Sequence, residues 1–267
     1  MPNSAALVLA LTAHFIGDYY LQWQSLADKK KRHLPTLLLH ALLYALPFGL
    51  TALFVALPWW VWLALVGSHL LIDLIKWLIE RRSNPAPDQV FLIDQLLHLL
   101  IIALLFAFIP QAVYKPAFTA LKADFWRWLL VFALIGKPAN VSFKMLFQRF
   151  SLGIKDLESS PVEQTSTPTR AEPKPGAGAW IGILERIFVV IFSAASQYAA
   201  FGLLMTAKSV ARYEKISKDP AFAEYYLIGT LYSVLFALLA YLLVFQVIWP
   251  LPAVAKAAPI MLALPTP

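Results

Sequence analysis

Long apolar runs separated by short polar stretches set the pattern of this sequence, and each run approaches the length of about 20 residues that a membrane-crossing helix needs. Charged residues gather between the runs and are few inside them. The expected helices cover about residues 5–26, 36–57, 59–79, 89–109, 180–206 and 222–248. This pattern predicts an all-α polytopic membrane bundle of six or seven spans, in which the first four helices form a module of two duplicated hairpins.

The apolar segment at residues 125–147 allows two interpretations, because Gly136, Lys137 and Pro138 interrupt it. If the segment is re-entrant, the basic loop at 207–218 falls on the same side as the other basic loops, and the chain crosses six times. If the segment is a bent span, the chain crosses seven times. The distribution of basic residues favours the re-entrant interpretation.

Changes in polarity divide the chain into five expected parts. One interior stretch is rich in Pro, Ser, Thr and Glu, a composition typical of disordered linkers, and the C-terminal tail is rich in Pro and Ala. The parts are a four-helix membrane module at 1–110, a bent or re-entrant segment at 111–150, the linker at 151–178, a membrane hairpin at 179–250 and a flexible tail at 251–267.

Composition supports a membrane protein and excludes several kinds of site. Of the 267 residues 60% are hydrophobic and 14% are charged, against about 25% charged in soluble domains. The net charge of +7 is concentrated in loops that suit anionic lipid headgroups, so we expect membrane lipids rather than nucleic acid as partners. The absence of cysteine excludes disulfides, zinc–thiolate sites and cysteine nucleophiles. No basic region or cleavage site accompanies the first span, which we expect to be retained.

Histidine and aspartate are paired at a spacing of four residues in three of the apolar helices. Residues four apart share one face of a helix. Ionisable side chains inside a bilayer usually face the interior of a bundle or a water-filled cavity. The pairs are His14 with Asp18, His69 with Asp73, and Asp94 with His98. Three such pairs predict a polar site inside the four-helix module.

The two copies of the His-x-x-x-Asp motif indicate a repeat and a common depth. A shift of 55 residues superposes the motif at His14 on that at His69, and it places His40 between Asp94 and His98. With a rise of about 1.5 Å per residue, these side chains fall within about 9 Å of the midpoints of their spans, displaced towards the basic loops. The sequence therefore predicts one polar layer on that side of the membrane midplane.

Several stretches resemble the uncharacterised bacterial membrane family called domain of unknown function 3307 (DUF3307). Over about residues 5–110 the similar motifs are HFIGDYYLQ, HLLIDLIKW and FLIDQLLH; the later segments IGILERIFVV, AKSVARYEK and AEYYLIGTLYS are similar to the C-terminal region of longer members. The resemblance implies a multi-pass protein of the bacterial inner membrane, and it brings no established reaction. A looser likeness, to membrane-bound proteins described as metal-dependent hydrolases, rests on His and Asp in short hydrophobic helices alone.

Metal binding is the most specific hypothesis for the His/Asp residues. Imidazole nitrogens and carboxylate oxygens suit Zn²⁺, Mn²⁺ or Fe²⁺. The expected ligands are His14, Asp18, His40, His69, Asp73, Asp94 and His98. An open coordination position would activate water, with Asp73 or Asp94 as the general base and Lys76 stabilising phosphate charge. On this hypothesis the protein is a metal-dependent hydrolase of a lipid or lipid-linked substrate.

Two other interpretations of the same residues remain open, so the sequence leaves undecided whether the protein is an enzyme. A buried His/Asp network can specify helix packing without a metal, as in a membrane scaffold, and a chain of such groups can carry protons or ions in a transporter. His33 lies in a basic loop and is expected in solvent. In the C-terminal part, Arg186, Lys208 and Arg212 form a second set that could hold a lipid phosphate, although anchoring at the membrane interface explains them too.

Overall fold

The structure, a computed structural model, describes residues 3–83, 85–158 and 176–250. Apart from two strands of two residues each, the described elements are helices, which confirms the predicted all-α class. Contacts divide the described residues into two compact units, 3–138 with 242–250 and 139–241. The two units are described separately below.

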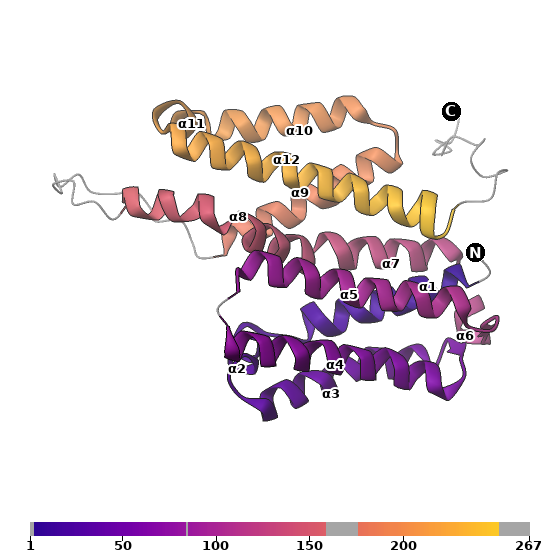
Figure 1. Cartoon of the computed structure of the whole chain (residues 1–267). Helices are drawn as coiled ribbons and strands as arrows, with labels where there is room; N and C mark the ends of the chain where they lie inside the picture. The colour runs from indigo at the N-terminus through magenta and orange to yellow at the C-terminus, as the bar shows by residue number, and fades with distance from the viewer. Residues whose placement is uncertain (1–2, 84, 159–175, 251–267) are drawn as a thin grey trace, which may run out of the picture. The chain divides into compact units, whose positions relative to one another are not determined.

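Four helices of the first unit form a closed bundle. The helix α1 packs against α3 and α5, and α4 packs against the same two helices; Figure 1 shows the four lying along a common direction. The elements of the unit are α1 (Ser4–Phe15), the π-helix η1 (Ile16–Tyr20), α2 (Gln24–Lys30), α3 (Leu34–Thr51), β1 (Val55–Ala56), α4 (Trp59–Arg82), α5 (Pro87–Phe108), β2 (Val113–Tyr114), α6 (Pro116–Thr119), α7 (Ala123–Ile135) and the π-helix η2 (Leu243–Ile248). Each of the four helices therefore turns one face towards a shared interior.

The polarity of this bundle is inverted relative to that of a soluble protein. His40, His69 and Asp73 are buried, whereas Leu42 of α3 and Leu96 of α5 are 64% and 65% exposed. The helices α3, α4 and α5 are each long and apolar enough to cross a membrane. Apolar side chains outside and ionisable side chains inside are expected where lipid surrounds a bundle. The helices are compatible with a multi-pass membrane protein.

The helix α1 is enclosed on all sides. All twelve of its residues are buried, because α7 and η2 also pack against it. Arg127 of α7 fastens the end of η2: its Nε donates to the carbonyl oxygen of Trp249 at 2.9 Å, and its guanidinium lies 4.6 Å from the centre of the Trp249 ring. Because α1 has neighbours on every side, it needs apolar residues around its whole circumference, and its sequence provides them.

One end of the bundle is closed by backbone and side-chain hydrogen bonds. The strands β1 and β2 pair antiparallel, with Val55 opposite Tyr114. Asn3, just before α1, donates from Nδ2 to the carbonyl oxygens of Phe106 at 3.4 Å and Ile109 at 3.3 Å, and its Oδ1 accepts from the N–H of Ala112 at 3.0 Å. These bonds join the start of α1 to the end of α5.

The first predicted span, residues 5–26, is wrong at its C-terminal end. The helical path that starts at Ser4 ends at Tyr20, and α2 is bent by 86° from it. The backbone of Trp23 is extended between the two. Leu26 and Lys30, one helical turn apart, are both buried, so α2 lies with one face against the bundle.

The next three predicted spans correspond to α3, α4 and α5, but the span predicted at 36–57 is wrong at its C-terminal end, because α3 ends at Thr51 and β1 follows. The segment predicted at 125–147 forms α7 and the first part of α8 (Lys137–Glu158), which together make one candidate span, Ala123–Phe147. This supports the bent-span interpretation over the re-entrant one. By length and composition, the described residues contain five candidate spans, or six if α1, η1 and α2 count as one.

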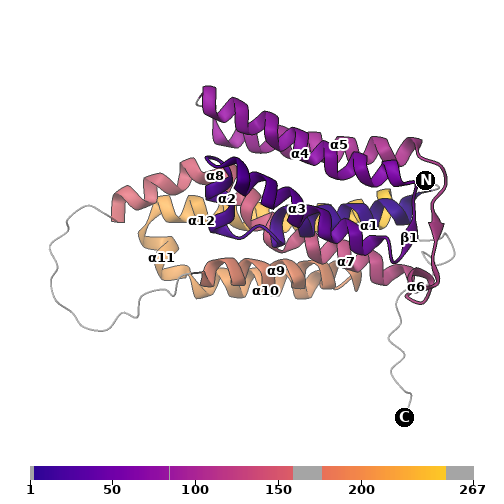
Figure 2. The same ribbon diagram turned by 90° about the horizontal axis from the view of Figure 1, so that it is seen from below.

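In the second unit, the prediction of a single hydrophobic segment at 180–206 is wrong. Two helices, α9 (Ala177–Ala194) and α10 (Tyr198–Ala211), replace it and pack side by side (Figure 2). Ser196 between them has a φ of 58°, a left-handed conformation that helps to reverse the chain. The short helix α11 (Tyr213–Lys218) then leads to α12 (Pro220–Leu242), which continues directly into η2.

The linker predicted at 151–178 is wrong at both ends, because α8 continues to Glu158 and α9 begins at Ala177. The stretch between them, 159–175, and the predicted tail at 251–267 lie outside the described residues.

Candidate metal centre

One histidine from each helix of the bundle points into the shared interior. His14 comes from α1, His40 from α3, His69 from α4 and His98 from α5, and each side chain is at most 3% exposed. The ring of His69 lies centrally: its centre is 4.4 Å from that of His98, 5.3 Å from that of His40 and 6.2 Å from that of His14. The structure thus brings together four of the seven expected ligands.

The three aspartates lie against these rings. His40 Nε2 is 3.4 Å from Asp18 Oδ1 and 3.5 Å from Asp73 Oδ2, and the latter oxygen is 3.7 Å from His69 Nε2. Asp94 Oδ1 is 4.0 Å from His98 Nδ1. All three carboxylates are buried. The i, i+4 pairs predicted from the sequence therefore share one polar centre.

Two lysines and a glutamine reach the carboxylates from the α2 side of the cluster. Lys30 Nζ donates to Asp73 Oδ2 at 3.2 Å, and Lys76 Nζ lies 3.0 Å from Asp94 Oδ2. Gln95 Nε2 donates to Asp18 at 3.0 Å and to Asp94 at 3.2 Å. Within this described cluster, three carboxylates face two ammonium groups, so neutral imidazoles would leave one formal negative charge. A buried negative charge favours the binding of a cation.

Tyr44 of α3 orients two of the histidines. Its ring stacks on that of His69 with centres 3.5 Å apart and an interplanar angle of 3°. Its hydroxyl lies 3.1 Å from His14 Nδ1. A hydrogen bond to one ring nitrogen fixes the direction of the other, which is how histidine ligands are commonly held. Nε2 of His14 is thereby left to face the cluster.

The wide turn of η1 places Asp18 within the cluster. Single π-turns inside α-helices occur often at functional sites. Gly17 in this turn lies against α3: a Cβ added there would stand 2.9 Å from Tyr44 Cδ2 and 3.1 Å from Tyr44 Cα. Only a residue without a side chain allows the two helices to approach this closely.

Two trios of side chains have the spacing of a metal site. In each trio, Asp18–His40–His69 and His69–Asp73–His98, one potential ligand atom per residue lies within 4.8 Å of the others. His40 Nε2 and His69 Nε2 are 3.2 Å apart. Ligands bound about 2.0–2.1 Å from a tetrahedral zinc ion lie about 3.3–3.4 Å from one another. The buried His/Asp groups can therefore hold a metal ion.

Several buried nitrogens of the cluster have no hydrogen-bond partner among the described residues. They are His14 Nε2, His40 Nδ1, His69 Nδ1 and both ring nitrogens of His98. Asp94 Oδ1 also has no hydrogen-bond partner among the described residues. Buried polar groups are nearly always paired, so a cluster with this many unpaired atoms is incomplete as a purely structural network. Such atoms suit a ligand or ion.

The structure separates the predicted residues into two groups. Asp18, His40, His69, Asp73 and His98 belong to the trios, whereas His14 and Asp94 lie beside them and outside both. Lys76, predicted to carry phosphate charge, is bound to Asp94. His33, the fifth histidine, is exposed as expected.

Lys30 and Gln95 belong to the cluster, although neither is among the site residues predicted from the sequence. In the sequence Lys30 is one more member of a basic loop, and only the four-residue spacing from Leu26 marks it as facing inward. Gln95 could have been found from the repeat, since the shift of 55 residues aligns it with His40.

The second predicted set lies in the second unit and forms no part of this cluster. Arg186 is buried, Arg212 is exposed, and Lys208 is bonded to Glu185 at 2.7 Å. A role in holding lipid phosphate stays a prediction for these three residues.

Comparison with known families gives one match. Residues 6–124 match the family described as "Protein of unknown function (DUF3307)", and this range includes all seven predicted ligands. No curated protein and no solved structure matches the chain. The chemistry of the site therefore rests on its geometry.

Proposed function

We propose, for a chain whose residues 6–124 belong to the DUF3307 family, that the four-helix bundle is an intramembrane metal-dependent hydrolase acting on a phosphate-containing lipid or lipid-linked substrate. The divalent ion would be Zn²⁺, Mn²⁺ or Fe²⁺, which histidine and aspartate bind together. The proposal also places the chain in the inner membrane of a bacterium, as the resemblance of its motifs implies.

One observation carries the metal proposal: the separations around His40 Nε2. They are 3.2 Å to His69 Nε2, 3.4 Å to Asp18 Oδ1 and 3.5 Å to Asp73 Oδ2. The two carboxylate separations exceed the usual range of hydrogen bonds, about 2.7–3.2 Å, but agree with the edge of a tetrahedral site, about 3.3–3.4 Å. The separations within the trio of Asp18, His40 and His69 fit a metal ion held between their ligand atoms.

The count of ligands supports catalysis. Each trio supplies three protein ligands, the number found in catalytic zinc sites, where a fourth position is left for water or substrate. A metal ion in such a site lowers the pKa of its bound water and supplies a nucleophile. If the ion sits in the trio of Asp18, His40 and His69, Asp73 is left as general base; in the other trio that role falls to Asp94.

The lysines support an anionic substrate. Lys30 and Lys76 lie on the α2 side of the cluster, where the Lys76 side chain is 21% exposed. Ammonium groups at the mouth of a buried site stabilise phosphate oxygens. A substrate anchored in the membrane would present its phosphate from that side, with Lys76 the first cation that it meets.

A proton relay is a second candidate, and one contact favours it. The facing Nε2 atoms of His40 and His69, 3.2 Å apart, could pass a proton between imidazoles. Against this, the halves of α1, α3, α4 and α5 nearest β1 and β2 carry no charged side chain in the described sequence. A relay needs groups on both sides of the membrane.

The deciding experiment is metal analysis of the full chain purified in maltoside micelles and incubated with each metal in turn. We expect about one equivalent of metal per chain in the wild type, its loss in His69→Ala, which belongs to both trios, and no change in His33→Ala. Asp18→Asn, nearly isosteric, serves as a second variant if His69→Ala fails to fold.

The loaded protein is then assayed for phosphate release from a phosphatidic acid and from an isoprenoid pyrophosphate. Release by the wild type, with loss in Lys76→Met, supports the hydrolase. Absence of metal from folded wild-type protein contradicts the whole proposal. In that case proton flux through reconstituted vesicles, sensitive to His40→Gln, would identify the relay.

A further inference from the structure

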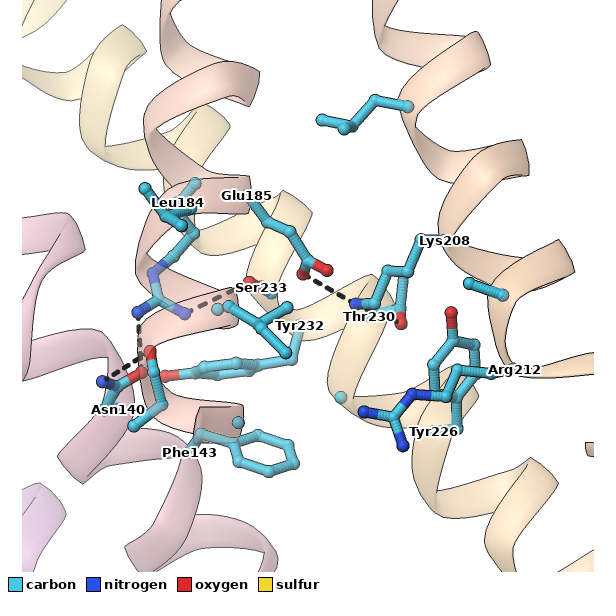
Figure 3. Close-up of a pocket in the computed structure, with 18 of the residues that line it drawn as sticks. Asn140, Phe143, Leu184, Glu185, Lys208, Arg212, Tyr226, Thr230, Tyr232 and Ser233 are labelled. Atoms are coloured by element: carbon cyan, nitrogen blue, oxygen red, sulfur yellow. Dashed lines mark hydrogen bonds and ion pairs between the residues drawn. The ribbon is translucent and has the colours of Figure 1, made fainter. Parts of the chain in front are cut away.

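A cavity of about 710 Å³ lies within the second unit, between α9, α10 and α12, with Asn140 and Phe143 of α8 in its wall (Figure 3). This volume is in the range of ligand-binding pockets, which are mostly apolar with a few fixed polar groups. This cavity has an apolar lining and a few polar groups held in place by hydrogen bonds. The residues that supply the polar groups all belong to the second unit.

Lys208 of α10 holds one side of the polar part. Its Nζ donates to Glu185 Oε2 of α9 at 2.7 Å and to Thr230 Oγ1 of α12 at 3.0 Å. The same ammonium lies 5.2 Å from the centre of the Tyr226 ring. The lysine is therefore tied to three points on two helices and presents a fixed positive charge to the cavity.

Arg186 is fixed on the other side by neutral groups. Its Nη1 donates to Ser233 Oγ at 3.2 Å and its Nη2 to Asn140 Oδ1 at 2.7 Å. Both acceptors are neutral groups, and the two bonds fix the orientation of the guanidinium. Gly182 gives it room, because a Cβ added there would stand 3.1 Å from Nη1.

Two further groups at the cavity have donors to spare. The phenol oxygen of Tyr226 is buried, and no described residue forms a hydrogen bond with it. Arg212, at the C-terminal cap of α10, lines the cavity and is exposed. A phenol and a guanidinium both donate hydrogen bonds to phosphate oxygens.

The charges that line the cavity do not balance. Glu185 is paired with Lys208, and no other carboxylate among the described lining residues opposes the formal positive charge of Arg212. An anionic ligand would neutralise that charge. This is a different situation from the His/Asp cluster of the first unit, whose formal charge is negative.

On the Ser196 side of Lys208 and Glu185 the cavity has apolar lining residues. Arg212 caps α10 and Lys208 lies one turn inside it; Leu204 follows after another turn, towards the chain reversal at Ser196. Phe188 of α9 also lies on the Ser196 side of Glu185 and lines the cavity. A ligand that fits this order has an anionic head and a hydrocarbon tail.

We propose that this cavity binds an anionic membrane phospholipid. The phosphate accepts hydrogen bonds from the Arg212 guanidinium, the Tyr226 hydroxyl and the Lys208 ammonium, and one acyl chain lies along Leu204 and Phe188. A lipid headgroup would lie at the ends of α10 and α12 near α11, because α11 carries the basic residues Lys215 and Lys218. The site is separate from the metal centre and does not depend on it.

The test uses the full chain in maltoside micelles and measures the binding of phosphatidylglycerol by native mass spectrometry. The double variant Arg212→Gln/Tyr226→Phe removes donors for which no side-chain hydrogen bond within the described residues is known, and it keeps the aromatic ring at position 226. Loss of charge-assisted hydrogen bonds should raise the Kd about tenfold or more. Lys31→Gln, the same change of charge at an exposed residue of the first unit, should leave the Kd unchanged.

Two competitors distinguish recognition of the phosphate from recognition of the acyl chains. Diacylglycerol, which has the chains without phosphate, and inorganic phosphate, which has the charge without chains, should each compete at least about tenfold less well than phosphatidylglycerol. Equal binding by the double variant and the wild type would overturn the proposed head site. Competition by diacylglycerol or by free phosphate as strong as that of the whole lipid would overturn the assignment to a phospholipid.

Discussion

The ring of Tyr44 lies flat against the ring of His69, with centres 3.5 Å apart, while its hydroxyl lies 3.1 Å from His14 Nδ1. One side chain of α3 thus sets the positions of histidines from α4 and α1. Because Tyr44 itself is 1% exposed, its ring has little freedom to move, and its contacts restrict the motion of the two histidine rings.

Tyr44→Phe keeps the stacked ring and removes the bond to His14. We expect the free energy of unfolding to fall by about 1–2 kcal/mol, because His14 Nδ1 would be left buried without its partner. Tyr44→Leu loses the stacking as well and should cost at least about 1 kcal/mol more. Thermal unfolding in maltoside micelles measures both, with the exposed Tyr213→Phe as control. Equal stability of Tyr44→Phe and wild type would show that the hydroxyl does not position His14.

Gly17→Ala should push η1 away from α3. The new methyl group would stand 2.9 Å from the Tyr44 side chain and 3.1 Å from its Cα, and overpacking of this kind costs about 1–3 kcal/mol. Gly67→Ala on α4 is the matched control, since a Cβ there meets nothing within 4 Å. It should be neutral or stabilising by up to about 1 kcal/mol, because alanine favours a helix. The same melting experiment decides, and similar values for both variants would contradict the close approach.

Lys30→Met should have opposite effects on stability and on metal binding. Removing the ammonium leaves Asp73 buried without its 3.2 Å partner, which should destabilise the metal-free protein by about 3 kcal/mol. The cluster then carries more negative charge, so its affinity for a divalent ion should rise about tenfold or more. Calorimetric titration with Zn²⁺ measures the affinity, and Lys31→Met, at an exposed neighbour, is the control. Weaker binding by Lys30→Met would mean that the lysine helps to hold the ion's ligands in place.

Asn3→Ala tests the opposite end of the bundle. The change leaves the buried N–H of Ala112 without its acceptor and should lower the free energy of unfolding by about 1–3 kcal/mol. Metal content should stay unchanged, because Asn3 bonds near the end of α5 that is remote from Asp94. Loss of metal along with stability would show that the site responds to the whole bundle, and the exposed Ser83→Ala provides the baseline.

The spans and the converging pairs could be predicted from the sequence because both depend on local periodicity. Apolar runs of sufficient length predict α3, α4 and α5. A spacing of four residues places Asp73 one helical turn from His69 on the same face of α4, whichever helices pack against it. The repeat then aligns the polar positions of neighbouring helices. That the side chains bind metal stays a prediction, as does the number of membrane crossings.

The features that escaped prediction depend on tertiary packing. The direction of α2, and so the contact of Lys30 with Asp73, follows from how its buried face meets the bundle, and a run of lysines gives no sign of it. The reversal at Ser196 uses a left-handed backbone at a residue that is not glycine, which no turn signature announces. Both differences arise because a polar stretch packs as a helix and an apolar stretch reverses direction, and local sequence patterns predict neither.

Each of the four bundle helices contributes a single histidine to the same centre. An ion coordinated by Asp18, His40 and His69 would need η1, α3 and α4 together, and would have no such site in a chain that lacked one of them. By mass action, occupancy would then stabilise the folded arrangement in proportion to ion concentration and affinity. Depletion of the ion would lower the stability of the helix packing as well as abolish catalysis. Metal binding would therefore depend on correct assembly of the helices and would favour it.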